Sequence, residues 1–388
     1  MGAGESGVTN DRVRSVFVAV DAFDRFDYGL SHPLKMYRLQ LTSELIFSLN
    51  LFKTTNSTIV PARMATDAEV LTFHDSDYLD VLKSADNGNV SPDLFRSGLG
   101  TADCPAFEGC CEGSLLACGA SLAAADELIG GNAEVAFNIS GGLHHAHQSR
   151  ASGFCYVNDP VVAINKLLGH FERVAYVDID AHAGDGVMEA FYDTNRVLTI
   201  STHENGRFLF PGTCFEDEVG EGNGVGFAVN IPFMPKSGDD AFIKGFDEIV
   251  VPLLHAYAPD VLVTQLGVDT LSSDPITDWE LTTRSLLHAL AAFRTIKVPW
   301  LALGGGGYDV ANVCRGWTLA WAAMNGVEVS DDVPKVWETA AAQYGVQVAQ
   351  LRDSKPSSSQ RSVLNDLDRV NSSLKETVFP VHGLPSTL

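Results

Sequence analysis

The chain has 388 residues, of which 45% are hydrophobic and only 19% charged, so it can bury a large core and does not have the composition of a disordered protein. Its formal net charge of −23 at pH 7 repels phosphate backbones and argues against direct nucleic-acid binding, although the same field could attract lysine-rich polypeptides. Residues 1–14 are polar, no stretch reaches the about 20 apolar residues of a membrane span, and the seven cysteines lack CxxC spacing, so we expect a cytoplasmic protein without a secretion signal, a membrane segment or disulfides.

Short runs of apolar or β-branched residues predict strands that are buried on both faces of a parallel sheet. In chain order these runs are Val16–Asp21, Val135–Ser140, Val174–Asp180, Val197–His203, Phe227–Pro232, Val261–Asp269 and Trp300–Leu303. Stretches with helical periodicity lie between many of them, which predicts crossover units and an α/β layer architecture. The expected helices are Ser114–Leu128, Val161–Leu168, Asp240–Tyr257, Leu281–Phe293 and Val310–Met324.

We expect one domain over residues 1–388, with a core in about residues 15–326 and a C-terminal extension over residues 327–388. Within the extension, residues 352–362 are polar and rich in serine, which is typical of a linker. The segment that follows it is expected to dock on the main domain.

Acidic residues and a histidine follow the strand predicted at Val174–Asp180. Asp178, Asp180 and His182 alternate, so on an extended chain their side chains point to one face. Another strand ends at Asp269. Asp180, His182 and Asp269 would make a three-ligand site with positions left for water and substrate, as in catalytic metal centres. The alternative for each residue alone is a helix cap or a hydrogen-bonded core histidine, but the DxDxH pattern followed by Gly-Asp-Gly favours a metal.

Two adjacent histidines, His144 and His145, follow a Gly-Gly pair. One charged imidazole lowers the pKa of its neighbour, which suits acid–base chemistry. Asp178 and Asp185 are carboxylates that could orient the two rings. A polar or metal-binding loop is the alternative, and His147 is interpreted as a surface residue.

A third feature is a strand that runs into Gly304–Gly307 and Tyr308. The run lacks the GK[ST] and GxGxxG patterns of phosphate-binding loops. A glycine run lets the backbone approach a substrate closely, and the hydroxyl of Tyr308 could donate a hydrogen bond to an oxyanion. A purely structural turn is equally compatible with the pattern.

Taken in order, these motifs resemble the zinc-dependent histone deacetylase superfamily, and within it class I enzymes and the bacterial acetoin-utilisation-type deacetylases. The resemblance covers about residues 27–326 and rests on residues 141–145, 151–159, 178–186, 210–213, 269–270 and 304–308. It implies an arginase-like α/β fold, a three-layer domain around an eight-stranded parallel sheet.

The resemblance also implies a role for each matching residue. Asp180, His182 and Asp269 would bind Zn²⁺ or Fe²⁺. His145 would be the general base and then the general acid, with Asp185 behind it, and His144, backed by Asp178, would tune the charge. Tyr308 would bind the carbonyl oxygen. The other implied positions are Gly153, Phe154 and Phe210 in the acyl-lysine channel, Asp103, Ile276 and Gly306 in substrate binding, Arg38 in an internal cavity, and Asp178, Asp180, His182, Ser201 and Thr202 around a structural K⁺.

The sequence departs from the family pattern at Ala183, where a second histidine is usual. The expected activity is metal-dependent hydrolysis of Nε-acetyl-lysine in proteins or peptides to lysine and acetate. Alternatives are a deacylase of acetylpolyamines or of longer acyl-lysines, a catalytically silent acyl-lysine binding module, and a two-metal ureohydrolase, for which the chain offers too few ligands. The sequence indicates neither the native substrate nor the oligomeric state.

Overall fold

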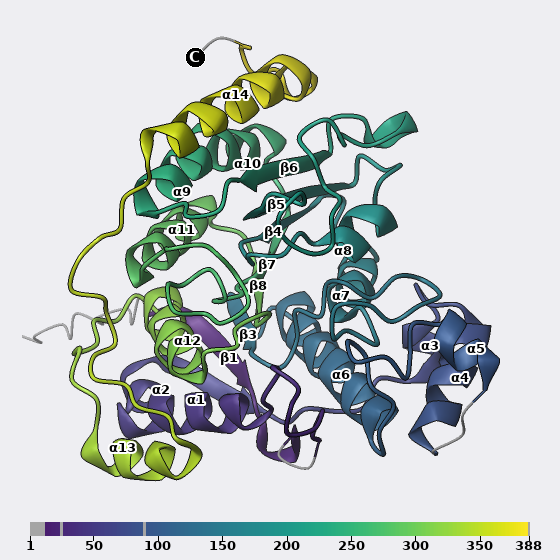
Figure 1. The fold of residues 1–388 in the computed structure, drawn as a ribbon, viewed down its shortest axis with the longest axis vertical. Coiled ribbons are helices and arrows are strands. Elements are labelled where there is room, and N and C mark those ends of the chain that lie inside the picture. The colour runs from purple at the N-terminus through teal and green to yellow at the C-terminus, as the bar shows by residue number, and fades with distance from the viewer. Residues whose placement is uncertain (1–11, 24–25, 88–90, 387–388) are drawn as a thin grey trace, which may run out of the picture.

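The computed structural model describes residues 12–23, 26–87 and 91–386. Residues 1–11, on which most of the expectation about a secretion signal rests, lie outside the described residues. At the centre is a parallel sheet with the strand order β2-β1-β3-β8-β7-β4-β5-β6 (Figure 1). Its strands are β1 (Arg14–Val18), β2 (Asn56–Val60), β3 (Val135–Asn138), β4 (Val174–Asp178), β5 (Val197–Glu204), β6 (Ala228–Phe233), β7 (Val261–Gln265) and β8 (Trp300–Leu303). The α/β class and the eight-stranded parallel sheet are therefore confirmed.

Both faces of the sheet are buried by helices. Alternate residues of β4 belong to two cores: Val174 and Tyr176 pack with α6 and α7, and Ala175 and Val177 pack with α11 and α12. Because neither face meets water, every position of β4 is buried, and a continuous apolar run is the sequence that such a strand requires.

The helices form a layer on each side of the sheet. In Figure 1, α6, α7 and α8 cover one face, and α9 to α12 with α14 cover the other. The α-helices of the described residues are α1 (Tyr37–Ser48), α2 (Leu51–Thr54), α3 (Asp67–Val70), α4 (Ser76–Asp86), α5 (Pro92–Arg96), α6 (Cys110–Ile129), α7 (Asp159–Leu167), α8 (Asp185–Ala190), α9 (Asp239–Gly245), α10 (Val251–Tyr257), α11 (Thr283–Ile296), α12 (Val310–Met324), α13 (Lys335–Ala341) and α14 (Arg361–Thr377). A π-helical segment, Phe246–Val250, joins α9 to α10, so the helix predicted over Asp240–Tyr257 is continuous but not uniform.

Several predicted strands are too long at their carboxyl ends. β4 ends at Asp178 and not at Asp180, β7 ends at Gln265 and not at Asp269, and β1 ends before the 3₁₀ turn at Asp21–Phe23. The reason is that the loops after these strands are themselves buried and carry apolar residues, such as Ile179 and Leu266. Burial continues the apolar run beyond the last strand hydrogen bond.

Strand β2 is not predicted by the apolar pattern. It pairs only with β1, at one edge of the sheet, and its residues are exposed or partly exposed. An edge strand that faces solvent needs no continuous apolar run, which is why the criterion used for the central strands misses it.

The C-terminal extension runs across the surface before it ends in a helix. The serine-rich residues 352–360 form no regular element, yet the backbone of Ser357 donates to Asp239 Oδ2 at 2.9 Å and Ser359 donates to Asp240 Oδ1 at 2.8 Å. Helix α14 then packs against β6 and α9. Its buried residues belong to the same hydrophobic core as those of β6 and α9. The linker-like segment is thus tied to α9 by its serines.

The carboxyl ends of β3, β8, β7 and β4 are neighbours in the sheet. The loops that leave these four strands therefore meet at one edge, where open α/β sheets commonly place their ligands. No helix among the described residues is long and apolar enough to cross a membrane.

Candidate active site

Asp180, His182 and Asp269 lie together at this edge. One ligand atom from each residue lies within 4.8 Å of the others. The ring Nδ1 of His182 is 2.9 Å from Asp269 Oδ2 and 3.2 Å from Asp180 Oδ1, and all three side chains are buried. Two carboxylates and one imidazole that face a common point are a suitable donor set for a divalent metal such as Zn²⁺ or Fe²⁺.

The convergence of these three residues depends on contacts outside β4. Because β4 ends at Asp178, regular strand alternation does not extend to residues 180 and 182. The side chain of Gln265 and the backbone amide of Gly306 donate to Asp180 Oδ2 at 2.6 and 2.7 Å, and the amide of Ala181 donates to Asp269 Oδ1 at 2.9 Å. The end of β7 and the loop after β8 therefore hold Asp180, and the loop after β4 holds Asp269.

The electrostatics of this cluster favour a cation. Burial together with the negative charge of Asp180 raises the pKa of Asp269 to about 8. Burial disfavours the charged ring of His182, but its hydrogen bonds to Asp180 and Asp269 outweigh this and raise its pKa to about 10. Two buried carboxylates in contact are costly unless a positive charge compensates them, so the donor set fits a bound cation.

His144 and His145 form a contacting pair with separate carboxylate partners. Their Nε2 atoms are 3.0 Å apart. His144 Nδ1 lies 2.7 Å from Asp178 Oδ2, and His145 Nδ1 lies 2.7 Å from Asp185 Oδ1. Each carboxylate fixes one ring nitrogen as a donor, so the Nε2 atoms are left to act on each other and on a substrate.

The two rings have opposite pKa shifts. Burial disfavours the charged form of His144, but the charges of Asp178 and Asp180 outweigh it and raise its pKa to about 9. Burial and the positive charge of His144 lower the pKa of His145 to about 4, against the opposing pull of Asp185. At neutral pH the pair therefore combines a charged His144 with a neutral His145, which has a lone pair available to accept a proton.

Gly153, Phe154 and Phe210 lie close to the histidine pair. Gly153 and Phe154 both have positive φ, 52° and 66°, and a Cβ on Gly153 would lie 2.3 Å from the ring of His145. Asp103 accepts the amide of Gly153 at 2.8 Å. The ring of Phe210 packs edge-on to that of His145 with centroids 5.0 Å apart. Asp103 thus holds the turn that places Gly153 and Phe154 beside the histidine pair. Only glycine fits at position 153, because a side chain there would collide with His145.

Tyr308 lies beside the metal-type cluster. Its ring is perpendicular to those of Phe154 and His182, with centroids 5.7 and 6.3 Å away. Its backbone amide donates to Asp274 Oδ2 at 2.8 Å, and the other oxygen of Asp274 accepts the amide of Ile276 at 3.1 Å. Partly buried Ile276 therefore lies on a loop that is bonded directly to the tyrosine.

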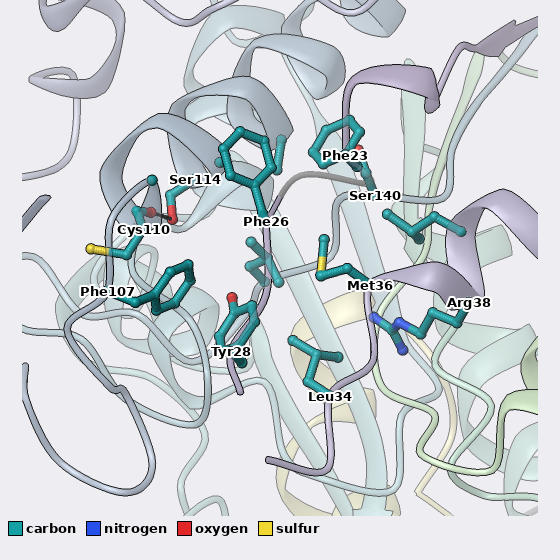
Figure 2. A pocket seen from close by; sticks show the side chains of 15 residues that line it. Phe23, Phe26, Tyr28, Leu34, Met36, Arg38, Phe107, Cys110, Ser114 and Ser140 are labelled. Carbon is teal, nitrogen blue, oxygen red and sulfur yellow. Dashed lines mark hydrogen bonds between the residues drawn. The ribbon is translucent and has the colours of Figure 1, made fainter. Parts of the chain in front are cut away.

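Arg38 lines an internal pocket behind this site (Figure 2). Its guanidinium donates to the carbonyls of Gly305 and Gly307 at 2.9 Å each. The pocket has a cavity volume of about 30 Å³ and shares Leu34, Arg38 and Leu143 with the hollow that contains His145 and Tyr308. In Figure 2, Arg38 lies next to Leu34 and Met36, across the pocket from a group of aromatic side chains.

The positions implied for K⁺ are also neighbours. Asp178 is paired in register with Ser201, and the hydroxyl of Thr202 donates to the carbonyl of Asp178 at 3.2 Å.

The usual second histidine is replaced by Ala183, which is buried and whose carbonyl accepts the amide of Asp185 at 2.8 Å.

Sequence reasoning missed several residues that support the site. Gln265 and Asp274 are buried and hold Asp180 and Tyr308, as described above, and Asp159 accepts the amides of Gly142 and Leu143 at 3.0 and 2.8 Å. An isolated polar residue at the end of an apolar strand, as at Gln265, is a signal that could have been used.

His147, interpreted as a surface residue, lines a surface groove, but its ring is largely covered. Its side chain is only 12% exposed, and its Nε2 lies 3.5 Å from Asp185 Oδ2. The cause is α8, which packs the carboxylates of Asp185 and Glu189 against the ring.

The model of the histone deacetylase domain matches residues 32–324. The chain belongs to the histone deacetylase family. It is therefore a hydrolase of this family, as the motif order indicates.

Similar proteins come from both bacteria and eukaryotes. The chain is 38% identical over 332 residues to the acetoin utilization protein AcuC of Bacillus subtilis, covering 83% of this chain and 85% of AcuC. It is 39% identical over 310 residues to histone deacetylase HDAC1 of Drosophila melanogaster, covering 79% of this chain but 59% of the longer fly protein.

Among solved structures, an HDAC homolog from Aquifex aeolicus superposes with a TM-score of 0.84 at 31% identity, covering 92% of this chain and 100% of that one. An HDAC homolog complexed with SAHA superposes with a TM-score of 0.83. These matches confirm the arginase/deacetylase-like fold.

Proposed function

We propose that this protein is a metal-dependent lysine deacetylase that hydrolyses Nε-acetyl-lysine in peptides or proteins to lysine and acetate. The observation that carries the proposal is the meeting, at one edge of the sheet, of a buried Asp-His-Asp cluster and a histidine pair with divided pKa values. The first provides ligands for a cation, and the second provides a base that is neutral at pH 7.

Asp180, His182 and Asp269 would hold the cation, which we propose to be Zn²⁺, with Fe²⁺ as the alternative for the same donor set. When bound, a divalent cation polarises a carbonyl oxygen and can lower the pKa of a water molecule from about 15.7 to about 7. Ser201 and Thr202, with the backbone of residues 178–182, are proposed to hold a structural K⁺.

The residues of the chain would divide the proton transfers among them. Neutral His145 accepts the proton of the attacking water, and Asp185 stabilises the imidazolium that results. Tyr308 donates a hydrogen bond to the oxyanion as it forms. His145 then returns its proton to the lysine nitrogen, and charged His144 limits how basic His145 becomes. General acid–base catalysis of this kind contributes about 10²–10⁴ in rate.

We propose that the side chains beside the histidine pair select a long, thin substrate. The methylene chain of the acyl-lysine is proposed to lie between Gly153, Phe154 and Phe210. Gly306 is proposed to contact the substrate deeper in the site, and Ile276 is proposed to contact it at the rim. The carboxylate of Asp103 has one oxygen on Gly153 and is proposed to accept from the substrate backbone with the other. The inner pocket beside Arg38 could receive the acetate, because a buried guanidinium attracts an anion.

A panel of substrates tests the proposal. Purified protein loaded with Zn²⁺ is assayed on acetyl-lysine peptide, longer acyl-lysine peptides and acetylputrescine, before and after chelation. We expect acetate release from the acetyl-lysine peptide to be the fastest reaction and to disappear with the metal. Faster turnover of the polyamine or of a longer acyl group would redirect the substrate assignment, and tight peptide binding without acetate release would indicate a silent binding module.

The cysteines agree with a cytoplasmic location, which is also a proposal. All seven are buried thiols, a form that a reducing compartment maintains.

A further inference from the structure

His147 extends the series of polar contacts that begins at the proposed base. His145 Nδ1 lies 2.7 Å from Asp185 Oδ1, and the second oxygen of the same carboxylate, Oδ2, lies 3.5 Å from His147 Nε2. The opposite ring nitrogen of His147, Nδ1, contacts the carboxylate of Glu189. One buried carboxylate is thus placed between two imidazoles, one in the site and one at the surface.

A second group competes for the same nitrogen of His147. The Nη2 of Arg150 lies 3.0 Å from His147 Nε2. Arginine only donates, so this hydrogen bond requires a lone pair on Nε2 and therefore a neutral ring. A proton on Nε2 would break the bond to Arg150 and create a donor for Asp185. The two arrangements exclude each other because they use one nitrogen in opposite roles.

The charged and titratable groups around His147 come from four segments. On α8, Asp185 and Glu189 favour the charged ring, and on its own loop Arg150 opposes it. Glu218 and Glu221 line the same surface groove, and His74 lies behind the loop, against the carbonyl of Gln148. With these groups the hydrogen bond to Asp185 outweighs partial burial and raises the pKa of His147.

We propose that His147 is a positioning residue for the His145–Asp185 pair. The protonation state of His147 decides whether Asp185 interacts with His145 alone or with both histidines. With His147 neutral, the full charge of Asp185 supports the imidazolium of His145. With His147 charged, part of that support is withdrawn and His145 becomes a weaker base. This inference builds on the proposed function, because it assigns a consequence to the basicity of His145.

The kinetic test compares three metal-loaded proteins: the wild type, His147→Gln and His147→Lys. At the pH where His145 takes up its proton, His147 is already charged in the wild type. His147→Gln removes that charge, so the acid limb of kcat/KM should move up by about 0.5–1 pH unit, the order expected for one nearby charge. His147→Lys keeps a positive charge, and its acid limb should stay near that of the wild type. Metal content is checked at each pH.

Glu189→Gln is the matched control, because it removes a carboxylate from the other side of the ring and leaves Asp185 in place. It should lower the pKa of His147 without moving the acid limb. Equal shifts in His147→Gln and His147→Lys, or no shift in either, would overturn the proposal, because charge would then have no part in the effect.

A second measurement does not depend on activity. In protein labelled with ¹⁵N at histidine, the ring resonances of His147, assigned with His147→Gln, report its pKa. We expect Asp185→Asn to lower this pKa by about 0.5 unit or more and Arg150→Gln to raise it. A pKa that Asp185→Asn leaves unchanged would overturn the proposal. A protein without deacetylase activity that still shows these shifts would instead contradict the proposed function alone.

Discussion

The chemistry of this protein depends on a few buried side chains whose partners determine their charge. His144 and His145 are adjacent in the chain, but Asp178 and Asp185 hold them separately, so one ring is charged and the other neutral at pH 7. Division of two like groups into different protonation states by their surroundings is a common basis for acid–base catalysis. The sequence shows the pair, and the structure shows that the two rings have opposite pKa shifts.

The role of Tyr308 can be tested by removing one oxygen atom. Tyr308→Phe should reduce kcat on acetyl-lysine peptide by about 10²–10³, the usual cost of losing one oxyanion donor. Metal content and thermal stability should not change, since the ring packing against Phe154 and His182 is kept. Tyr344→Phe, at a 46% exposed position, is the matched control, and near-full activity of Tyr308→Phe would show that the assignment is wrong.

The pH dependence should follow the histidine pair. The pKa of His145 is lowered to about 4, so loss of the base becomes important only as the pH falls toward 4. The pKa of His144 is raised to about 9, so its charge is present at neutral pH and lost as the pH rises through 9. We therefore expect kcat/KM to be bell-shaped with these two limbs.

His144→Gln should remove the alkaline limb. It should also move the acid limb upward, since the charge that lowers the pKa of His145 is gone. An alkaline limb that persists unchanged in this variant would assign it to another group.

At the scale of elements, α9, α11 and the C-terminal extension are joined through one carboxylate. Asp239, the first residue of α9, accepts the backbone amide and hydroxyl of Thr282 and the hydroxyl of Ser285 at 2.7–2.9 Å. The same carboxylate accepts the amide of Ser357. Asp239 is buried, so water cannot take the place of its carboxylate as the acceptor for these donors.

Asp239→Ala should therefore destabilise the protein by on the order of 3 kcal/mol, because it leaves several buried donors without a partner. The neighbouring Asp240 is exposed, and Asp240→Ala, which loses its contacts to Ser359, should cost about 1 kcal/mol or less. Denaturant unfolding measures both. The site should be unaffected, so a similar loss for the two variants, or a kcat change without a stability change, would contradict this role.

At the scale of the whole molecule, the sheet order joins parts of the chain that are far apart. The order β3-β8-β7-β4 places loops from residues 139–147, 179–184, 266–270 and 304–308 at one edge. A ligand bound there would link both halves of the sheet, so it should stabilise the fold as a whole.

Metal removal tests this link. A ligand that binds only the folded state stabilises it by about 2.7 kcal/mol at 100 times its dissociation constant, so chelation should lower the midpoint of thermal unfolding and Zn²⁺ should restore it. Asp269→Asn should weaken the response to both treatments. A rigorously metal-stripped wild type with the same midpoint and full deacylation would contradict the metal site.

Much of the fold and of the site could be predicted from the sequence alone. Continuous apolar runs indicated the buried parallel strands, because a strand covered on both faces has no polar position. The DxDxH block, the histidine pair and the glycine run into Tyr308 indicated the chemistry, because few other settings require these residues in this order. These signals are local, since each is contained within about ten residues.

Only the tertiary structure decided what lies between these local signals. In the structure β4 ends at Asp178, and hydrogen bonds from Gln265 and Gly306 orient the carboxylate of Asp180. The tertiary structure also brought α8 against His147, a residue that the sequence pattern assigned to the surface. These contacts join residues from about 40 to more than 100 positions apart, and no periodicity or motif encodes such a pair, because the order of the strands in the sheet determines which loops meet.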